Sequence, residues 1–493
     1  MNKESRRAGE CDKSFFCCRF APVCLLRDII PDKSFQPLRI KNGNSPVHFR
    51  IKFLIFGTVF CNGCVIFIIM SKLKQDIFLT LTVLFGVAGF AQETLTWEEC
   101  FARAVSNNLN LSAGRLKLEE AEVALKSQKS VYLPEISADG KYGSVGTKNK
   151  NDSDWHAHDT SSVGLSARYV LFNGFGDRAR VSRAEAELYA EYANFDQTCA
   201  NLEYNLRRAF AQQLYAQELI ALAENIAVRR ADNVRLIDMR YKGGRENKGS
   251  LLLNQAQHRQ SLYDVEEAKR ALVLARRQLA TLMGEYQPDE FFVEGELYAG
   301  IPPERAALNE LAAQTPTYRS AEANVKAAEQ GYVITRSAHF PTITASGSAG
   351  RSGNSELENK SWSASISASV PLFQGGRLYH DTIAAGLARE RTRLNAEQTM
   401  LELLNTLQDS LNSYTDRYET MGVQEELLRA AEMRAEVARA QYQQGLISFQ
   451  DWDTIENSLI NSQKSWLLSR RNADQAMAAW RNAQGISSID QNN

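Results

Sequence analysis

The chain has 493 residues, of which 44% are hydrophobic and 23% are charged, with 8 cysteines and 11 prolines. So few cysteines exclude a disulfide scaffold, and so few prolines exclude a loop-rich or collagen-like chain. Six of the cysteines lie before residue 65. The beginning of the chain is therefore a different kind of sequence from the rest.

A secretory signal peptide is expected at residues 70–91. Lys72 and Lys74 form a basic start, and residues 77–90 form an apolar stretch. Gly89-Phe90-Ala91 then supplies small residues of the kind that a signal peptidase reads, which places cleavage after Ala91. No cysteine follows directly, so a lipidated N-terminus is not expected.

Residues 1–69 have no comparable pattern. We interpret them as upstream sequence translated from a start codon assigned too early. The alternative is a membrane-anchoring helix in the apolar run at 53–70, because about 18 apolar residues can just span a bilayer. Residues 1–91 hold 13 of the 57 Lys and Arg residues and 6 of the 58 Asp and Glu residues. The rest of the chain therefore has 44 basic and 52 acidic residues, a net charge of −8. This acidic balance argues against a nucleic-acid-binding protein.

The rest of the chain is a tandem repeat of one unit of about 200 residues, as three recurring segments indicate. Leu133-Pro134-Glu135-Ile136 returns as Phe340-Pro341-Thr342-Ile343, Leu171-Phe172-Asn173-Gly174 as Leu372-Phe373-Gln374-Gly375, and Tyr241-Lys242-Gly243-Gly244 as Tyr442-Gln443-Gln444-Gly445. The first offset is 207 residues and the other two are 201. The sequence therefore predicts a first unit at 92–290, a second unit at 291–485 and a tail at 486–493.

Each unit is predicted to contain a helix, two strands and two long helices. Thr96 and Glu99 have the spacing of a capping box, which predicts a helix start. The first helix is expected to run without interruption until Pro134 stops it, and its counterpart until Pro341.

Alternating apolar and serine residues predict the strands, at about 135–146 and 161–172 in the first unit and 342–350 and 361–371 in the second. The polar stretches 147–161 and 351–360 are expected to be hairpin loops. One apolar face and one serine-rich face suit a wall between lipid and water, but a sheet on a soluble core has the same alternation. Four strands cannot close a barrel, so a chain that spans a membrane this way must oligomerise.

The stretches from Gly174 to Gly244 and from Gly375 to Gly445 contain no proline, which predicts two helices close to 100 Å long. The second carries a coiled-coil seam of apolar residues at spacings of 3, 4 and 7. The seam consists of Leu403, Leu407, Leu411, Tyr414, Tyr418, Met421, Leu428, Ala431, Ala435, Ala438 and Tyr442. Gly244 and Gly445 are expected where each long helix reverses, and a shorter helix then returns to Gly284 or Gly485.

The sequence contains no phosphate loop, nucleophile elbow or zinc motif, so no enzyme, cofactor or metal centre is expected. His156 and His158 lie in a polar loop and are interpreted as solvated residues rather than metal ligands. Cys100 and Cys199 lie on separate helices and are interpreted as buried small residues rather than a disulfide.

An acidic cluster follows the second reversal, with Asp451 and Asp453 beside Trp452 and Glu456 one turn later. It can be a solvated helix start, where acidic residues favour the helix dipole. In a symmetric oligomer each acidic residue would instead form a ring, and such rings gate and select cations. Both interpretations remain open from the residues alone.

Residues 92–485 resemble the TolC family of outer-membrane efflux ducts, because these motifs occur in the same duplicated order. The resemblance rests on the Asn107-Asn108-Leu109 step before Leu133-Pro134, on the duplicated Leu-Phe-x-Gly segments and on the paired Tyr-x-x-Gly turns. It implies an α+β membrane protein that assembles as a homotrimer. Three sets of four strands would form a 12-stranded β-barrel in the outer membrane, and the long helices a coiled-coil tunnel in the periplasm.

The resemblance also implies a function and its sites. Asp451, with Asp453 beside it, would line a periplasmic gate, and the helix-tip turns at Tyr241, Gly244, Arg245, Tyr442, Gln443 and Gly445 would contact an adaptor protein. The family's second acidic position and its basic tip residue are Thr454 and Ile447 here. Residues 285–304 would join the two units and contribute to an equatorial belt.

The leading hypothesis is therefore a passive exit duct of a tripartite efflux or type I secretion system, with a periplasmic adaptor and an inner-membrane pump of the RND or ABC type as partners. No nucleic acid and no cofactor is implied. The alternative hypothesis is a soluble periplasmic coiled-coil scaffold or tether, which the long helices permit.

Overall fold

The computed structural model describes residues 93–489 apart from 149, 151–154, 287–289 and 355. The expected signal peptide at 70–91 and the segment 1–69 lie outside these residues and stay predictions. The elements follow each other as β1 (Glu93–Leu95), α2 (Trp97–Asn107), α3 (Leu109–Lys129), a 3-10 turn η1 (Ser130–Tyr132), β2 (Glu135–Thr147), β3 (His156–Asn173), α4 (Gly176–Lys242), α5 (Lys248–Leu282), β4 (Phe291–Val293), α6 (Leu308–Gln314), α7 (Pro316–Ser337), β5 (Thr342–Gly353), β6 (Asn359–Ser369), α8 (Arg377–Gln444) and α9 (Phe449–Ala483).

The first helix begins as expected but is not continuous. Thr96 and Glu99 form the predicted capping box at the start of α2. The helix then ends at Asn108, whose backbone is extended and whose side chain accepts hydrogen bonds from the N–H groups of Asn110 and Leu111 to begin α3. The expectation of one helix as far as Pro134 is therefore wrong, because a buried asparagine caps a second helix inside the apolar pattern.

The second unit has the same break. Thr315 ends α6 and caps α7, which has Pro316 at its first position. Asn108 and Thr315 are 207 residues apart, the same offset as the first of the sequence repeats. The duplication therefore extends to the interruption of the opening helix, although the residues that produce it differ.

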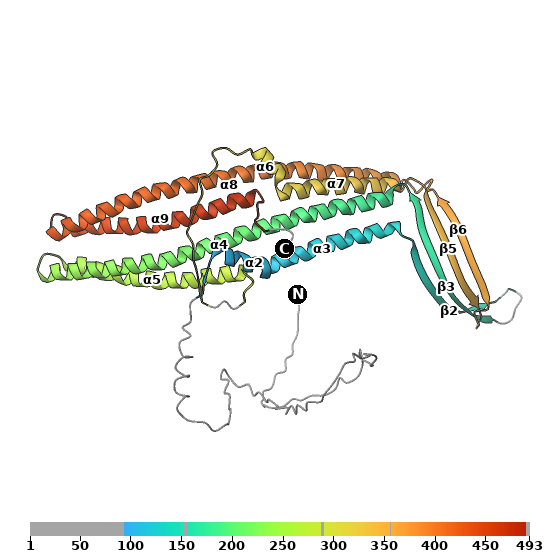
Figure 1. The fold of residues 1–493 in the computed structure, drawn as a ribbon, viewed down its shortest axis with the longest axis horizontal. Helices are drawn as coiled ribbons and strands as arrows, with labels where there is room; N and C mark the ends of the chain where they lie inside the picture. The colour runs from blue at the N-terminus through green and yellow to red at the C-terminus, as the bar shows by residue number, and fades with distance from the viewer. Residues whose placement is uncertain (1–92, 149, 151–154, 287–289, 355, 490–493) are drawn as a thin grey trace, which may run out of the picture. The chain divides into compact units, whose positions relative to one another are not determined.

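The predicted long helices are confirmed as α4 and α8, with 67 and 68 residues. Each turns back as a shorter helix, so that α4 packs along α5 and α8 along α9 (Figure 1). On the strand side of these hairpins, α3 packs on α4, α4 on α7 and α7 on α8. Every residue of the predicted seam of α8 is buried or half-buried, from Leu403 to Tyr442.

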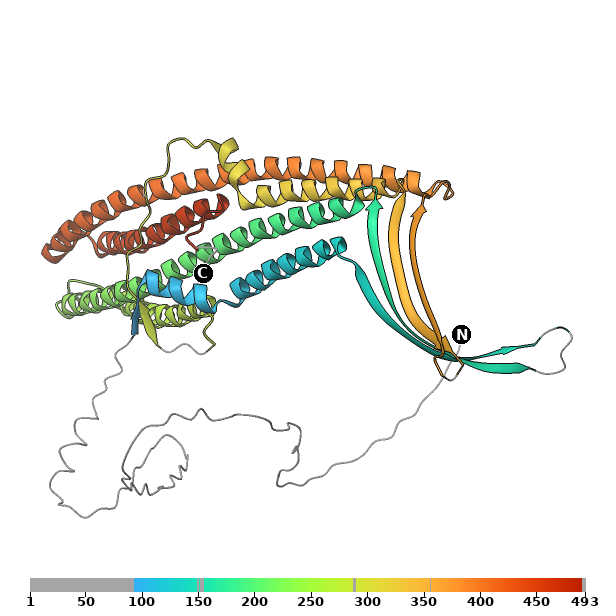
Figure 2. The same cartoon turned by 45° about the vertical axis from the view of Figure 1, so that its right-hand side comes forward.

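The four longer strands form one antiparallel sheet in the order β2-β3-β5-β6. The strands of the two units meet at β3 and β5, where Leu165 pairs with Ala349. Strand β3 begins at His156, where a hairpin loop was expected, and Thr147 pairs with His156. The β2–β3 hairpin therefore reaches beyond β5 and β6 (Figure 2). The alternation rule missed this extension because backbone pairing continues after the apolar residues stop.

The register confirms the two-faced sheet. Ile136, Ala167, Gly347 and Ala364 lie across the four strands on one face, which also carries Trp362. On the opposite face serine hydroxyls bond across the strands, with 2.7 Å between Ser137 and Ser166, 2.9 Å between Ser346 and Ser365 and 2.9 Å between Ser348 and Ser363. All of β6 is exposed in this single chain.

A small core lies where the two units are joined. β1 and β4 pair in parallel and pack on α4 and α5 through Leu95, Phe210, Leu279 and Phe291. Cys100 is buried in this core, and Cys199 in a neighbouring one. From β4 the chain crosses α9 to α8, where the hydroxyl of Tyr414 donates to the carbonyl of Gly300 at 2.7 Å. None of the described helices is both long enough and apolar enough to cross a membrane.

Two glycines that follow helix ends provide a matched test of this packing. Gly284 and Gly244 have φ of +80° and +71°, so alanine costs roughly 1–2 kcal/mol of backbone strain at either position. A Cβ on Gly284 would also lie 2.4 Å from the carbonyl oxygen of Asn107, whereas one on Gly244 meets nothing within 4 Å. We expect Gly284→Ala to lower the melting temperature of the detergent-extracted protein clearly more than Gly244→Ala does. Equal shifts would contradict the close approach at Asn107.

Candidate functional site: the tips of the two helical hairpins

The two hairpins reverse in matching ways. At the first tip, the N–H of Arg245 donates to the carbonyl of Arg240 at 2.8 Å, and at the second the N–H of Leu446 donates to that of Gln441 at 2.9 Å. Gly244 and Gly445 both have left-handed backbones, as their predicted role requires. Asn247 and Ser448 then cap α5 and α9, again 201 residues apart.

Tyr442 joins the two tips. Its side chain is fully buried, and its hydroxyl donates to a carboxylate oxygen of Glu246 at 2.8 Å. Its ring stacks on Trp452, with 4.5 Å between the centroids and 4° between the planes. The guanidinium of Arg240 lies 4.4 Å above the same ring and donates to the carbonyl of Tyr442 at 2.6 Å. Burial, and then the hydrogen bond to Glu246, raise the pKa of Tyr442, so it stays a neutral donor.

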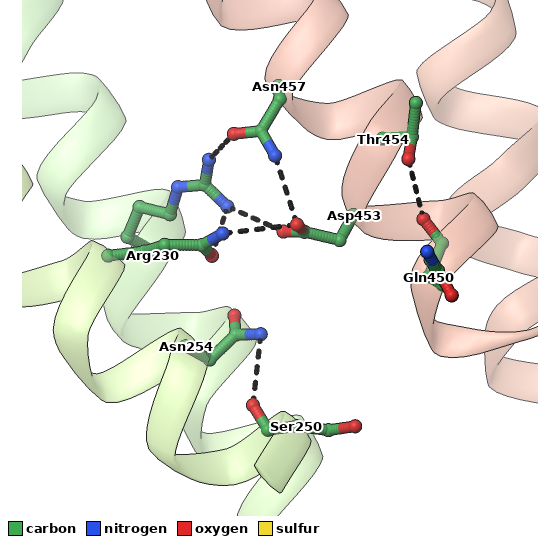
Figure 3. Close-up of polar contacts among 8 residues, drawn as sticks. Arg230, Ser250, Asn254, Gln450, Asp453, Thr454 and Asn457 are labelled. Carbon is green, nitrogen blue, oxygen red and sulfur yellow. Dashed lines mark hydrogen bonds and ion pairs between the residues drawn. The ribbon is translucent and has the colours of Figure 1, made fainter.

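A second connection between the two hairpins lies on α4 about three helical turns before Arg240, and so further from the tips. Arg230, almost fully buried on α4, reaches across to α9, where its guanidinium lies 3.4 Å from Asp453 and 2.5 Å from the amide oxygen of Asn457 (Figure 3). Asp453 also accepts from the amides of Gln257 on α5, at 3.1 Å, and of Asn457, at 3.0 Å. These four side chains hold α4, α5 and α9 together by a charged and polar contact.

The residues proposed from the sequence thus fall into two groups. Asp453 and Tyr442 point into the junction between the hairpins. Asp451 is exposed, and its carboxylate accepts a hydrogen bond from the hydroxyl of Ser448 at 2.6 Å. The remaining proposed residues are all exposed at the two tips, Tyr241 and Gln443 in the last turns of α4 and α8 and Gly244, Arg245 and Gly445 just after them.

Sequence reasoning missed Arg230, Glu246, Gln257 and Asn457. Only Arg230 could have been noticed from the sequence. It lies on the same face of α4 as Ile226, Asn233 and Ile237, which are all buried. A charge on such a face needs a buried partner. The partner, Asp453, is 223 residues away, and no local pattern connects the two.

Several buried polar atoms near this junction have no hydrogen-bond partner among the described residues. They include both side-chain polar atoms of Asn233, the amide oxygen of Asn254 and one carboxylate oxygen of Glu456. Burial raises the pKa of Glu456, against the opposing effect of Arg229, Arg230 and Arg439. The interior of the tips therefore combines an apolar cluster around Tyr442 and Trp452 with buried polar atoms that have no partner among the described residues.

Among the residues that the structure describes, no group of three or more His, Cys, Asp or Glu side chains is placed to hold a metal ion. His158 lies in β3 rather than in the polar loop where it was expected, and the side chain of His156 lies outside the described part. Burial raises the pKa of the Cys199 thiol to about 11, so it is not an activated nucleophile.

Comparison with known proteins gives a consistent result. Residues 101–285 and 307–485 match the family model described as outer membrane efflux protein. The cation efflux system protein CusC of Escherichia coli O157:H7 is 23% identical over 374 residues, which cover 74% of this chain and 80% of CusC. The toluene efflux pump outer membrane protein TtgI of Pseudomonas putida is 23% identical over 386 residues, covering 74% of this chain and 79% of TtgI.

A solved structure of CusC superposes with a TM-score of 0.72 at 19% identity, covering 81% of this chain and 95% of that one. This likeness shows the TolC-like fold that the repeated motifs predicted.

The raised pKa of Glu456 predicts a pH dependence. In the unfolded chain a glutamate has a pKa of about 4.3. When the folded-state pKa is higher, the carboxyl does not lower the stability of the fold at a pH below about 4.3, where it is protonated in both states. The fold loses stability as the pH rises through the folded-state pKa, because the carboxyl must then ionise where it is buried. The groups that face it are Arg229 and Arg230 on α4, Glu432, Glu436 and Arg439 on α8, and Asp453 on α9. We expect Glu456→Gln to melt at a higher temperature than the wild type at pH 7.5, with a smaller difference at pH 4. A difference that is the same at both pH values would show that Glu456 is not the titrating group.

Proposed function

The chain belongs to the outer membrane efflux protein family, and on this basis we propose that it is a trimeric exit duct whose periplasmic end is held closed by the hairpin tips. Its place is the outer membrane and its role is efflux, so the soluble-scaffold alternative is set aside. The observation that carries the duct is the four-stranded sheet, which has one continuous apolar face and two open edges. Transport, with no catalytic step of its own, is the activity that we propose.

The sheet supports assembly through its edges. β2 and β6 each pair on one side only, and an edge left open in lipid costs several kcal/mol for each unsatisfied group. Edge pairing with further copies removes this cost, and three copies of four strands give twelve. The exposed apolar face, with Ile136, Trp362 and Ile366, would then contact outer-membrane lipid.

The helices support the same assembly. Successive packing of α3, α4, α7 and α8 leaves α3 and α8 at the two ends of the layer. Each end helix carries three exposed apolar residues at heptad spacing, Leu109, Leu116 and Val123 on α3 and Leu387, Leu394 and Leu401 on α8. α3 runs toward the sheet and α8 away from it, so α8 of one copy fits antiparallel against α3 of the next.

In the periplasm we propose a gate at the tips. Asp451 projects from the second tip and would form an acidic ring in the trimer. The bonds of Tyr442 with Glu246 and of Asp453 with Arg230 would hold each pair of hairpins in the closed arrangement. Tyr241, Gly244, Arg245, Gln443 and Gly445 would present the turns to a periplasmic adaptor, which links the duct to an inner-membrane pump of the RND or ABC type.

We propose further that the pump, rather than the duct, selects the cargo. Two relatives of similar identity are named for different cargoes, cations for CusC and toluene for TtgI. The proposed gate side chains are bonded to neighbouring side chains of the tips, Asp451 to Ser448, Asp453 to Arg230 and Tyr442 to Glu246, rather than arranged around a bound cargo.

The proposed acidic ring at Asp451 predicts how a substitution there changes the conductance of purified channels in a planar bilayer. Asp451→Ala removes the charge and the longer side chain from each copy, so we expect higher conductance and weaker cation selectivity. The control is Asp238→Ala, which removes a half-buried aspartate of the other hairpin that is bound by Lys242 at 2.7 Å. Conductance and selectivity unchanged from the wild type would remove Asp451 from the gate.

The tyrosine contact predicts how readily the gate opens. Tyr442→Phe keeps the stacking on Trp452 but removes the hydroxyl, and one hydrogen bond to a charged acceptor is worth about 1.5 kcal/mol or more. If that bond exists only when the gate is closed, the ratio of open to closed channels should rise about tenfold. Tyr241→Phe, on the exposed turn of the other hairpin, should leave gating as in the wild type. If both variants change gating to a similar extent, or if neither changes it, the Tyr442 hydroxyl does not hold the gate closed.

A further inference from the structure

A basic groove lies far from the tips, where α9 crosses α4 and α5. It has a volume of about 860 Å³ and is bounded by residues 204–212 of α4, 271–282 of α5 and 471–475 of α9. Two arginines line it, Arg208 on α4 and Arg471 on α9. The described residues that line it include the amides of Gln212, Gln278 and Gln475 and no acidic side chain. The groove therefore carries two positive charges without a negative one.

Arg471 is held in place from several sides without a carboxylate partner. Its guanidinium donates to the amide oxygen of Gln212 at 3.0 Å and to that of Asn472 at 2.7 Å, and it lies 4.8 Å from the centroid of the Tyr215 ring. Its Nε is buried and has no hydrogen-bond acceptor in the described chain. Burial lowers the pKa of Arg471, although an arginine stays charged at any physiological pH.

Arg208 makes no ion pair with the described residues, although three neighbouring arginines do. Arg207 binds Asp474 at 2.5 Å, Arg470 binds Glu218 at 2.9 Å and Arg481 binds Glu203 at 3.4 Å. Asp474, Glu218 and Glu203 thus pair with arginines outside the groove. Arg208 and Arg471 keep guanidinium donors for an anion, and a guanidinium matches the planar oxygens of carboxylate and phosphate groups.

The groove lies on the opposite side of α4 from the small core. Leu206, Phe210, Gln213 and Gln217 face β1 and β4, whereas Arg208 and Gln212 face the groove. At 100° per residue these two sets lie roughly on opposite sides of the helix. In the proposed duct, a β1–β4 pair on the outside of the helical wall leaves the lumen open for passage. The groove then faces the lumen.

We propose that Arg208 and Arg471 form an anion-binding site on the inner wall of the duct, which takes the carboxylate or phosphate group of small solutes on their way out. This inference rests on the proposed trimeric duct, in which the site is repeated in each copy as a basic ring. A ring of fixed charges favours ions of the opposite sign. The duct would therefore carry a basic ring at its middle in addition to the acidic ring at its tips.

The test measures two properties of the full-length trimer, with inorganic phosphate as the probe. The first is calorimetric binding of phosphate to the detergent-purified protein, and the second is block of the planar-bilayer current by phosphate together with the reversal potential in a KCl gradient. We expect Arg208→Gln and Arg471→Gln each to weaken phosphate binding and block about tenfold, the loss of one charge-assisted hydrogen bond. Both should also move the reversal potential toward cation selectivity.

Arg470→Gln is the matched control, because it removes the same charge from the neighbouring residue of α9 that is bound to Glu218 outside the groove. It should leave phosphate binding and block unchanged. Arg208→Gln keeps the inference testable if Arg471→Gln fails to fold, since the guanidinium of Arg208 makes no ion pair with the described residues.

The outcomes separate the two proposals. Phosphate binding that is absent from the wild type, or that is equally strong in both groove variants, overturns the site even if the protein conducts. Binding that depends on the two arginines, in a protein that forms no channel, overturns the duct and the lumen ring together. Binding and block that both depend on the arginines support the whole inference.

Discussion

Strands β2 and β6 each turn one row of backbone N–H and C=O groups outward, with no partner among the described residues. In water such an edge is tolerated, but in lipid each unsatisfied group costs several kcal/mol. The apolar face of the same sheet belongs in lipid, and both demands are met only if the sheet closes through other copies. The exposed heptad residues of α3 and α8 then pack in the same step, because they lie at the two ends of the helical layer.

Duplication explains why one chain supplies two similar hairpins that meet at their tips. Both units repeat the break in the opening helix, the left-handed glycine at the reversal and the capped return helix. The side chains that join the two hairpins do not repeat. Tyr442, Glu246, Arg230 and Asp453 form contacts between units, so they make the halves different where the gate that we propose needs a junction that can be broken. Polar contacts suit such a junction, because water can replace them when the hairpins part.

Much of the fold could be predicted because its signals are local and periodic. The seam of α8, the left-handed Gly244 and Gly445 and the two faces of the sheet each follow from residues close together in sequence. The break at Asn108 could not be predicted in this way, because the amide of Asn108 also donates to the carbonyl of Leu282 on another helix. Asp451 and Asp453 are neighbours with the same chemistry, and only the packing of α4 against α9 separates the exposed one from the bound one.

The sheet edges and the end helices, as we propose, close between copies of this chain. The most direct measurement is the native mass of the protein after gentle detergent extraction of the outer-membrane fraction. We expect a single species of three chains that persists on dilution. A species of one chain would contradict it, because the edges of β2 and β6 would then remain open in the membrane. A species of two chains would give a different barrel and would contradict the proposed trimer.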